Sequence, residues 1–189
     1  MLMVVSQPRS KASHQYDQHG ADSLITQRFV VMGVAGCGKS SVAAALAERI
    51  DGKFIEGDDL HDASSIEKMS RGEALTDADR WPWLERLGLA IADSPTPVVA
   101  SCSSLKRSYR DRIRQQSKDT ICFVHLTATF DTIEKRMKQR SGHFMPAALL
   151  ASQFEALEPL QPDEAGMDIE AIHGLQEVVS STLDSIIES

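Results

Sequence analysis

Paired cysteines and long apolar runs are both scarce in this chain of 189 residues. The apolar opening, residues 1–5, is shorter than the core of a secretory signal, and no later run approaches the length of a membrane span. The three cysteines, Cys37, Cys102 and Cys122, are an odd set without metal-type spacing, which is typical of reduced thiols. We therefore expect a cytoplasmic protein with no membrane partner.

Positive charge is also in short supply. The chain has 20 Lys and Arg against 27 Asp and Glu, a formal net charge of −7. A general nucleic-acid binder carries a basic surplus, so we expect no nucleic-acid partner. The length and the 42% hydrophobic composition suit one compact domain with an ordinary core. Residues 1–27 are polar and aperiodic, which predicts a flexible extension before a domain at residues 28–189.

The most informative segment runs from Gly33 to Ser40 and fits G-x-x-x-x-G-K-[ST], the phosphate-binding loop. Glycines leave backbone N–H groups free to surround phosphate oxygens. Lys39 brings a positive charge to the β- and γ-phosphates, and the Ser40 hydroxyl can ligate Mg²⁺. The predicted binding residues for ATP in the loop are Gly33, Val34, Ala35, Gly36, Cys37, Gly38, Lys39, Ser40 and Ser41.

The surroundings of the loop support this interpretation. Residues 29–32 form an apolar run typical of a strand, and residues 41–50 carry apolar side chains on one helical face. This order of strand, loop and helix places the phosphates at a helix N-terminus, which favours anions. A glycine-rich turn without function is the alternative for the motif taken alone.

Strand-like and helix-like segments alternate along the rest of the chain. Further strands are expected at residues 53–56, 97–101, 121–126 and 167–169, of which the last is the least apolar. Helices are expected at residues 64–69, from Thr76 onward, at 105–116, from Phe130 to near Gly142, from Pro146 onward, and at the C-terminus. The alternation predicts an α/β fold, with a parallel sheet, helices on both faces, and ligands beyond the carboxyl ends of the strands.

Two of these helices have sequence signals for their first residues. Ser64 and Glu67 have the spacing of a capping box, and Thr76 and Asp79 have the same spacing. Each pair predicts a helix N-terminus at its Ser or Thr.

An acidic turn, residues 56–61, follows the second predicted strand. Its carboxylates are therefore expected at the same edge of the sheet as the phosphate loop. An enzyme that transfers a phosphoryl group needs a carboxylate there to orient the acceptor hydroxyl and accept its proton. A solvated acidic turn is the alternative if the segment is considered by itself.

Four further segments complete a recognisable pattern: Lys68-Met69, Asp79-Arg80-Trp81-Pro82-Trp83, residues 101–111, and Gly142-His143-Phe144-Met145. With them, the chain from about residue 29 to its C-terminus resembles the gluconokinases. These small kinases phosphorylate D-gluconate on its 6-hydroxyl with ATP, which gives 6-phospho-D-gluconate. The resemblance implies a P-loop kinase fold of the nucleoside-monophosphate-kinase type, a three-layer sandwich with a helical substrate part and a lid. It also implies Mg²⁺ as cofactor and a homodimer.

The resemblance assigns roles to individual residues. Asp58 matches the acceptor-side aspartate and is the candidate general base, which joins Lys39 and Arg140 as the catalytic set. Arg136 and Arg140 belong to the lid or contact ATP, where positive charge stabilises the transferring phosphoryl group. A basic helix end that complements the helix dipole is the alternative for Arg140. The residues implied for gluconate binding are Asp58, Lys68, Arg80, Lys106, Tyr109, Arg110 and His143.

The carboxylate of gluconate calls for an Arg or Lys clamp. Arg80 and Arg110 are the favoured pair, whereas Lys106 and Arg107 have a solvated helix face as their alternative. Trp81 and Trp83 are expected in the core of the substrate part, with a sugar-stacking platform as the alternative.

Two residues depart from the gluconokinase pattern. Glu56 stands where Asp is usual, and Cys37 stands in the loop where Ser or Thr is usual. Because Cys37 lies beside a helix N-terminus, we advance the hypothesis that its pKa is lowered and its thiol reactive. His125, inside a predicted strand, is interpreted as structural.

Two rival functions stay open at this point. One is another small-metabolite kinase of the same fold, such as a shikimate kinase, which the Asp-Arg-Trp-Pro-Trp and Gly-His-Phe-Met segments oppose. The other is a nucleotide-dependent switch, which would have no organic acceptor.

Overall fold

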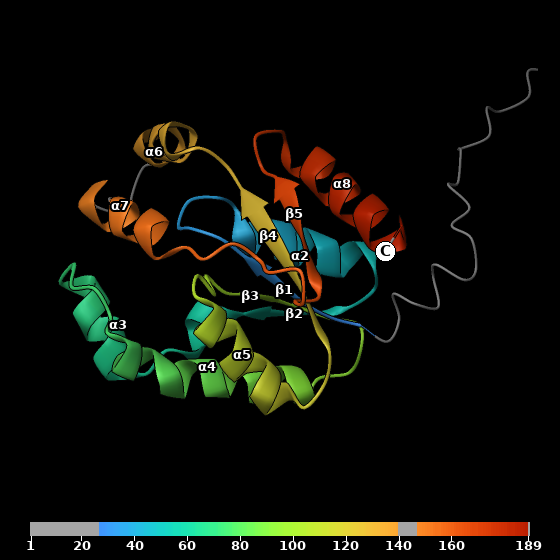
Figure 1. The fold of residues 1–189 in the computed structure, drawn as a ribbon, viewed down its shortest axis with the longest axis horizontal. Helices are drawn as coiled ribbons and strands as arrows, with labels where there is room; N and C mark the ends of the chain where they lie inside the picture. Colours follow the sequence, from blue (N-terminus) through green and yellow to red (C-terminus); the bar gives the residue numbers. More distant parts are fainter. Residues whose placement is uncertain (1–26, 140–146, 189) are drawn as a thin grey trace, which may run out of the picture.

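The computed structural model describes residues 27–139 and 147–188, in which a five-stranded parallel sheet forms the centre of the domain (Figure 1). The strand order is β2-β3-β1-β4-β5, and every neighbouring pair is parallel. The strands are β1 (Arg28–Met32), β2 (Lys53–Glu56), β3 (Val98–Ser101), β4 (Ile121–Thr127) and β5 (Gly166–Glu170). The predicted parallel sheet is confirmed, including its weakly apolar last strand.

The described helices are α2 (Lys39–Arg49), α3 (Ala63–Ser70), α4 (Asp77–Ala92), α5 (Arg107–Ser117), α6 (Phe130–Gln139), α7 (Ala147–Ala156) and α8 (Leu175–Glu188), with a 3₁₀ turn η1 (Gly57–Leu60). The predicted end of α6 near Gly142, the predicted start at Pro146 and the predicted N-terminal extension up to residue 26 lie outside the described residues.

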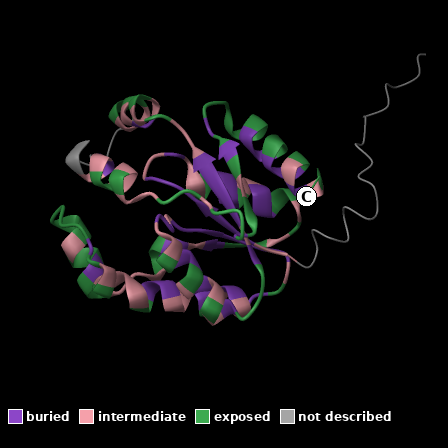
Figure 2. Cartoon of the chain, in the orientation of Figure 1, coloured by how far each residue is buried: buried purple, intermediate pink, exposed green. Residues whose placement is uncertain are grey.

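The helices cover both faces of the sheet, which gives the expected three layers (Figures 1 and 2). Phe29 and Val31 of β1 join a core with α2 and α8, whereas Val30 and Met32 join a second core with α4 and α5. Successive side chains of a strand point to opposite faces, so one continuous apolar run serves both cores.

One of the two predicted capping boxes is found. Thr76 is the N-cap of α4: its hydroxyl accepts from the Asp79 N–H at 3.3 Å, and the Asp79 carboxylate accepts from the Thr76 N–H at 2.9 Å. The predicted box at Ser64 is wrong. Asp62 caps α3 instead, because its carboxylate accepts from both the Ser65 N–H and the Ser64 hydroxyl, at 2.7 and 2.8 Å.

A buried ion pair joins α5 to the connection between α7 and β5. Arg110 and Glu164 are both fully buried, and two hydrogen bonds of 2.7 Å link guanidinium to carboxylate. Arg110 also donates to the carbonyls of Ser104 and Glu158 at 3.2 and 3.1 Å. The hydrogen bonds from Arg110 hold the pKa of Glu164 below its usual range, so the pair stays charged.

We predict that Glu164→Gln lowers the free energy of unfolding by about 3–5 kcal/mol, because Arg110 is left buried with its charge unpaired. Urea denaturation at neutral pH measures this. In the parent protein, Glu164 makes its full contribution to the free energy of unfolding above its ordinary pKa of 4.5. This contribution is lost as the pH falls toward the lowered pKa that Glu164 has in the folded protein.

The matched control is Asp163→Asn. Asp163 forms an exposed ion pair with Arg107 at 2.7 Å, and such pairs contribute about 1 kcal/mol or less. Equal losses in the two variants would contradict the structural role of the buried pair.

Candidate active site

The phosphate loop joins the end of β1 to the start of α2 and is open to an anion. Gly36 and Gly38 have φ values of 82° and 102°, a left-handed backbone that other residues rarely adopt. Among the described residues no side chain caps the N-terminus of α2, and a Cβ added to Gly38 would meet nothing within 4 Å. The positive end of the helix dipole therefore faces open space at Gly38, as a phosphate site requires.

Neighbouring elements hold the loop in this shape. The Gly33 N–H donates to the Ser103 carbonyl at 3.2 Å, which ties the loop to the segment after β3. On the other side, a Cβ added to Gly36 would lie 2.9 Å from the Met137 side chain of α6, so only glycine allows this close packing. Lys39 folds back within the loop, and its Nζ donates to the Val34 carbonyl at 3.0 Å.

Asp58 is exposed in η1, at the carboxyl end of β2. The preceding Glu56 carboxylate accepts from the Asp58 N–H at 3.4 Å and from the Ser101 hydroxyl, so Glu56 ties the Asp58 turn to the end of β3. Asp58 follows the carboxyl end of β2, and Lys39 follows the loop at the carboxyl end of β1. Because β2, β3 and β1 are parallel neighbours, the two predicted catalytic groups lie at the same edge of the sheet.

Two side chains behind this turn were not singled out together by sequence reasoning. Trp83 is buried and donates its indole N–H to the Gly57 carbonyl at 2.7 Å, which confirms its expected core position. The ring of His61 stacks on Trp83 with centroids 4.1 Å apart. Burial lowers the pKa of His61, so the imidazole is neutral at pH 7. Its signal in the sequence was its place three residues after Asp58.

Asp77, at the start of α4, organises the basic residues of the acceptor side. Its carboxylate accepts from Lys106 Nζ at 2.9 and 3.0 Å and from the Tyr109 hydroxyl. These bonds hold the pKa of Asp77 below its usual range, while burial raises the pKa of Tyr109. Arg80 lies 3.8 Å from the same carboxylate and 5.7 Å from the Tyr109 ring. Sequence reasoning missed Asp77 because its partners lie about thirty residues away.

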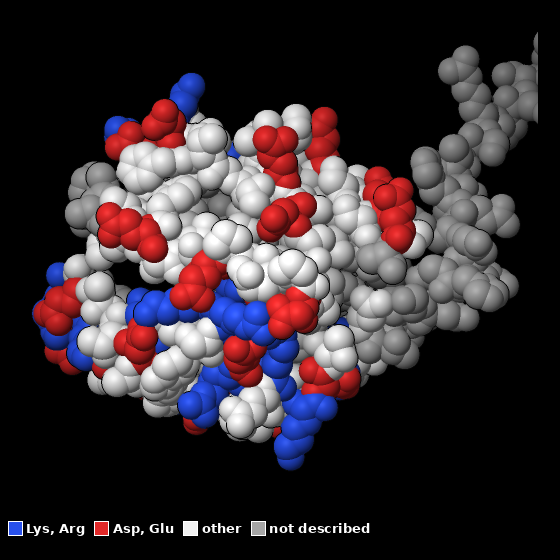
Figure 3. Space-filling view, viewed as in Figure 1, with Lys and Arg blue, Asp and Glu red and all other residues white. Residues whose placement is uncertain are grey.

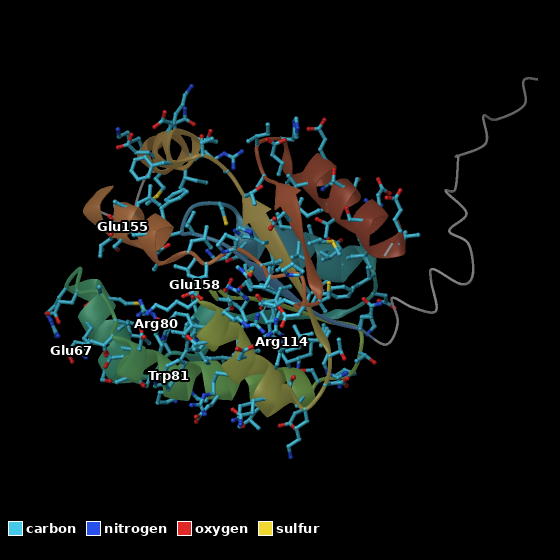
Figure 4. All side chains as sticks on the ribbon, viewed as in Figure 1. Glu67, Arg80, Trp81, Arg114, Glu155 and Glu158 are labelled. Carbon is cyan, nitrogen blue, oxygen red and sulfur yellow. The ribbon has the colours of Figure 1, made fainter. Side chains whose placement is uncertain are left out.

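Lys68 and Trp81 lie at the edges of this cluster. Lys68 of α3 pairs with Asp79 at 2.7 Å, which links α3 to α4. Trp81 is half-buried and meets the Tyr109 ring edge-on at 5.5 Å. In the space-filling view the surface is hollowed between α7 and α3, with Lys and Arg side chains below the hollow (Figure 3). Arg80 projects from the start of α4 toward it (Figure 4).

Comparisons with known proteins agree with this arrangement. A family model described as an AAA domain matches residues 29–160. The thermosensitive gluconokinase of Escherichia coli (strain K12) is 49% identical over 142 residues, 73% of this chain and 75% of that protein. The thermoresistant gluconokinase of the same strain is 42% identical, over 84% of this chain and 92% of its own length.

Solved structures extend the likeness. The crystal structure of a gluconokinase from Sinorhizobium meliloti 1021 is 44% identical with a TM-score of 0.80, over 87% of this chain and 93% of that one. The chain belongs to the gluconokinase family. A shikimate kinase structure from Aquifex aeolicus shares only the fold, at 16% identity, a TM-score of 0.59, and coverage of 85% of this chain and 96% of that one.

One residue that the gluconokinase pattern implied for substrate binding is placed elsewhere. Arg110 was expected to share the carboxylate clamp with Arg80, but its guanidinium is fully buried against Glu164. Because this side chain is 0% exposed and its guanidinium already donates to protein oxygens, the clamp prediction for Arg110 is corrected. Arg107 pairs on the surface with Asp163, in line with its solvated alternative.

The hypothesis of a reactive Cys37 is also corrected. Cys37 is 3% exposed, and burial raises the pKa of its thiol even though the charge of Lys39 acts in the opposite direction. The desolvation of a thiolate outweighs the helix N-terminus at this position. Cys37 therefore serves the gluconokinase loop as a small apolar residue that packs in the core.

Of the remaining predicted residues, some lie within the described part of the chain and others lie outside it. Arg136 of α6 is half-buried. Its positive charge lowers the pKa of the Cys37 thiol in the phosphate loop, against the larger effect of burial. Arg140 and His143 lie outside the described residues. His125 pairs with Asp168 at 2.7 Å between β4 and β5, in keeping with a structural role.

Within residues 27–139 and 147–188, no group of three or more His, Cys, Asp or Glu side chains could hold a metal ion. Ser40 is exposed at the first turn of α2, which suits a Mg²⁺ ion held mostly by phosphates and water. No described helix has the length and apolar character that crossing a membrane requires.

Proposed function

We propose that this chain transfers the γ-phosphoryl group of ATP to the 6-hydroxyl of D-gluconate. The supporting observation is one edge of the sheet that carries a phosphate loop, the exposed Asp58 carboxylate and the cluster around Asp77. The loop suits a triphosphate, and the cluster offers a polyhydroxy acid both cations and hydroxyl partners. The names of the relatives at 42–49% identity support gluconate as the acceptor.

In this proposal Asp58 orients the acceptor hydroxyl and receives its proton. Lys39 leaves the Val34 carbonyl and neutralises charge on the β- and γ-phosphates. Mg²⁺, held by Ser40 and the phosphates, supplies further charge neutralisation when it is bound. Arg136, and Arg140 beyond the described residues, extend the positive charge on the α6 side.

We assign the carboxylate of gluconate to Arg80 together with Lys106. Both side chains are partly exposed, at 28% and 31%, and both lie against the Tyr109 ring. Lys106 is already held by both oxygens of Asp77, whereas Arg80 donates within hydrogen-bond range only to the Leu75 carbonyl among the described residues. Arg80 therefore has more donors available for a bidentate contact.

The proposal includes a cytoplasmic location and a homodimer. Three free cysteines and ATP as phosphoryl donor support the location. The homodimer follows from the family resemblance, and sedimentation equilibrium tests it.

An assay of ADP release, coupled to an indicator reaction, tests the proposed function. We expect D-gluconate to stimulate ADP release at least about a hundredfold over the basal rate, whereas shikimate and other sugar acids give little stimulation. A basal rate that no acceptor changes would favour the nucleotide switch, and stimulation by shikimate alone would favour the other kinase.

We predict that Asp58→Asn lowers kcat by about 10²–10⁴ while nucleotide affinity is kept, because the amide cannot accept the proton. The control is Asp59→Asn, the adjacent exposed carboxylate in the same turn, which should leave kcat within about twofold of the parent. Near-normal turnover of Asp58→Asn would remove Asp58 from the role of general base.

We predict that Arg80→Gln raises the KM for gluconate about ten- to a hundredfold with the KM for ATP little changed, since a charge-assisted contact to the carboxylate is lost. Steady-state kinetics with each substrate varied in turn measures both constants. Arg71→Gln, at the exposed end of α3, removes the same charge and should change neither. An unchanged KM for gluconate would place the carboxylate elsewhere.

A further inference from the structure

A hydrogen bond connects α7 directly to the phosphate loop. Gln153 Oε1 accepts from the Ala35 N–H at 2.6 Å, although the two residues are 118 positions apart. A backbone N–H can only donate, so the oxygen of the amide must face the loop and its NH₂ group must point away. Gln153 lies outside the phosphate-loop motif and outside the short segments on which the family resemblance was recognised.

The packing of α7 determines where Gln153 lies. In the same helix, Leu150 is 1% exposed and joins the core that contains α2 and α8. Phe154 packs against Phe130 of α6 with ring centroids 5.5 Å apart. These two contacts fix the rotation of α7, and the side chain between them in the sequence meets the loop.

Two loop groups that the sequence predicts to bind phosphate are thus occupied by protein oxygens. The Ala35 N–H donates to the Gln153 amide, and Lys39 Nζ donates to the Val34 carbonyl. The acceptor for Lys39 lies within the loop itself. The acceptor for the Ala35 N–H lies on a separate helix, α7, so this hydrogen bond breaks only if α7 or the Gln153 side chain moves.

The chain after α7 leads straight to the acceptor side. The Glu158 N–H donates to the Leu105 carbonyl at 2.8 Å, and the Glu158 carboxylate accepts from the Arg107 N–H at 2.6 Å. Lys106 lies between these two partners, at the start of α5. The same stretch that holds Gln153 on the loop is therefore bonded to the residues on either side of a predicted gluconate contact.

We propose that Gln153 is a positioning residue that competes with a nucleotide phosphate oxygen for the Ala35 N–H, and so links α7 to the phosphate loop until nucleotide binds. This inference rests on the proposed function, since it needs a nucleotide in the loop. Loading the loop breaks the bond and releases the Gln153 side chain, and the bond lowers the apparent affinity for nucleotide by the fraction of molecules in which it is formed.

The test is calorimetric titration of the full chain with Mg²⁺-ADP and with a non-transferable Mg²⁺-ATP analogue. Gln153→Leu keeps the approximate size but cannot accept, so the nucleotide Kd should fall about two- to tenfold. Gln153→Glu keeps the shape and accepts more strongly, while its charge also repels phosphate, so the Kd should rise at least about tenfold. Ser152→Glu places the same charge on the exposed neighbour and should stay within about twofold.

The outcomes separate this inference from the proposed function. Opposite shifts for Gln153→Leu and Gln153→Glu support competition, because damage to packing alone would weaken binding in both. Unchanged or weaker binding by Gln153→Leu, or a Gln153→Glu value equal to that of Ser152→Glu, would overturn the role of Gln153 while the kinase assignment stands. A parent protein that binds no nucleotide in the titration would overturn the proposed function itself.

Discussion

The end of β3 is the structural element on which the site depends. On one side the Ser101 hydroxyl accepts from the Gly57 N–H at 3.3 Å, and on the other the Ser103 carbonyl accepts from the Gly33 N–H at 3.2 Å. Gly57 lies so close to the Ser101 backbone that a Cβ would not fit. The phosphate loop and the Asp58 turn are thus both hydrogen-bonded to residues 101–103. The distance between them is set by the spacing of parallel strands rather than by flexible loops.

The acceptor side relies on charge pairing instead of strand spacing. In a chain of net charge −7, Lys68, Lys106 and Arg80 converge because Asp77 and Asp79 at the N-terminus of α4 attract them. Asp79 also completes the capping box, so the residue that begins the helix positions part of the cluster. Cations held by existing partners are ordered before substrate arrives, which reduces the entropy cost of binding an anion.

Features encoded within a few residues could be predicted from the sequence. The strands followed from apolar runs, the loop from eight consecutive residues, and the start of α4 from Thr76 and Asp79, because each depends on local geometry. The capping box at Ser64 failed locally, because Asp62 two residues earlier takes the N-cap, whereas the site predictions failed where the deciding partner is remote. Nothing near Arg110 indicates that Glu164 will bury it, and nothing near Cys37 shows how completely the core covers its thiol. Gln153 is the clearest case, since its partner is 118 positions away.

The size of the contact between Gln153 and Ala35 suits a link that substrate must break. A neutral hydrogen bond contributes about 0.5–1.5 kcal/mol net, enough to hold the Gln153 amide on the loop in most molecules when no ligand competes. A bound triphosphate makes several charge-assisted bonds, each roughly twice as strong, so it displaces one amide oxygen at small cost. A buried ion pair such as Arg110–Glu164 would be too costly to break in each catalytic cycle. The molecule thus uses its strong pair to hold the 157–165 connection against α5, and a weak bond where α7 meets the phosphate loop.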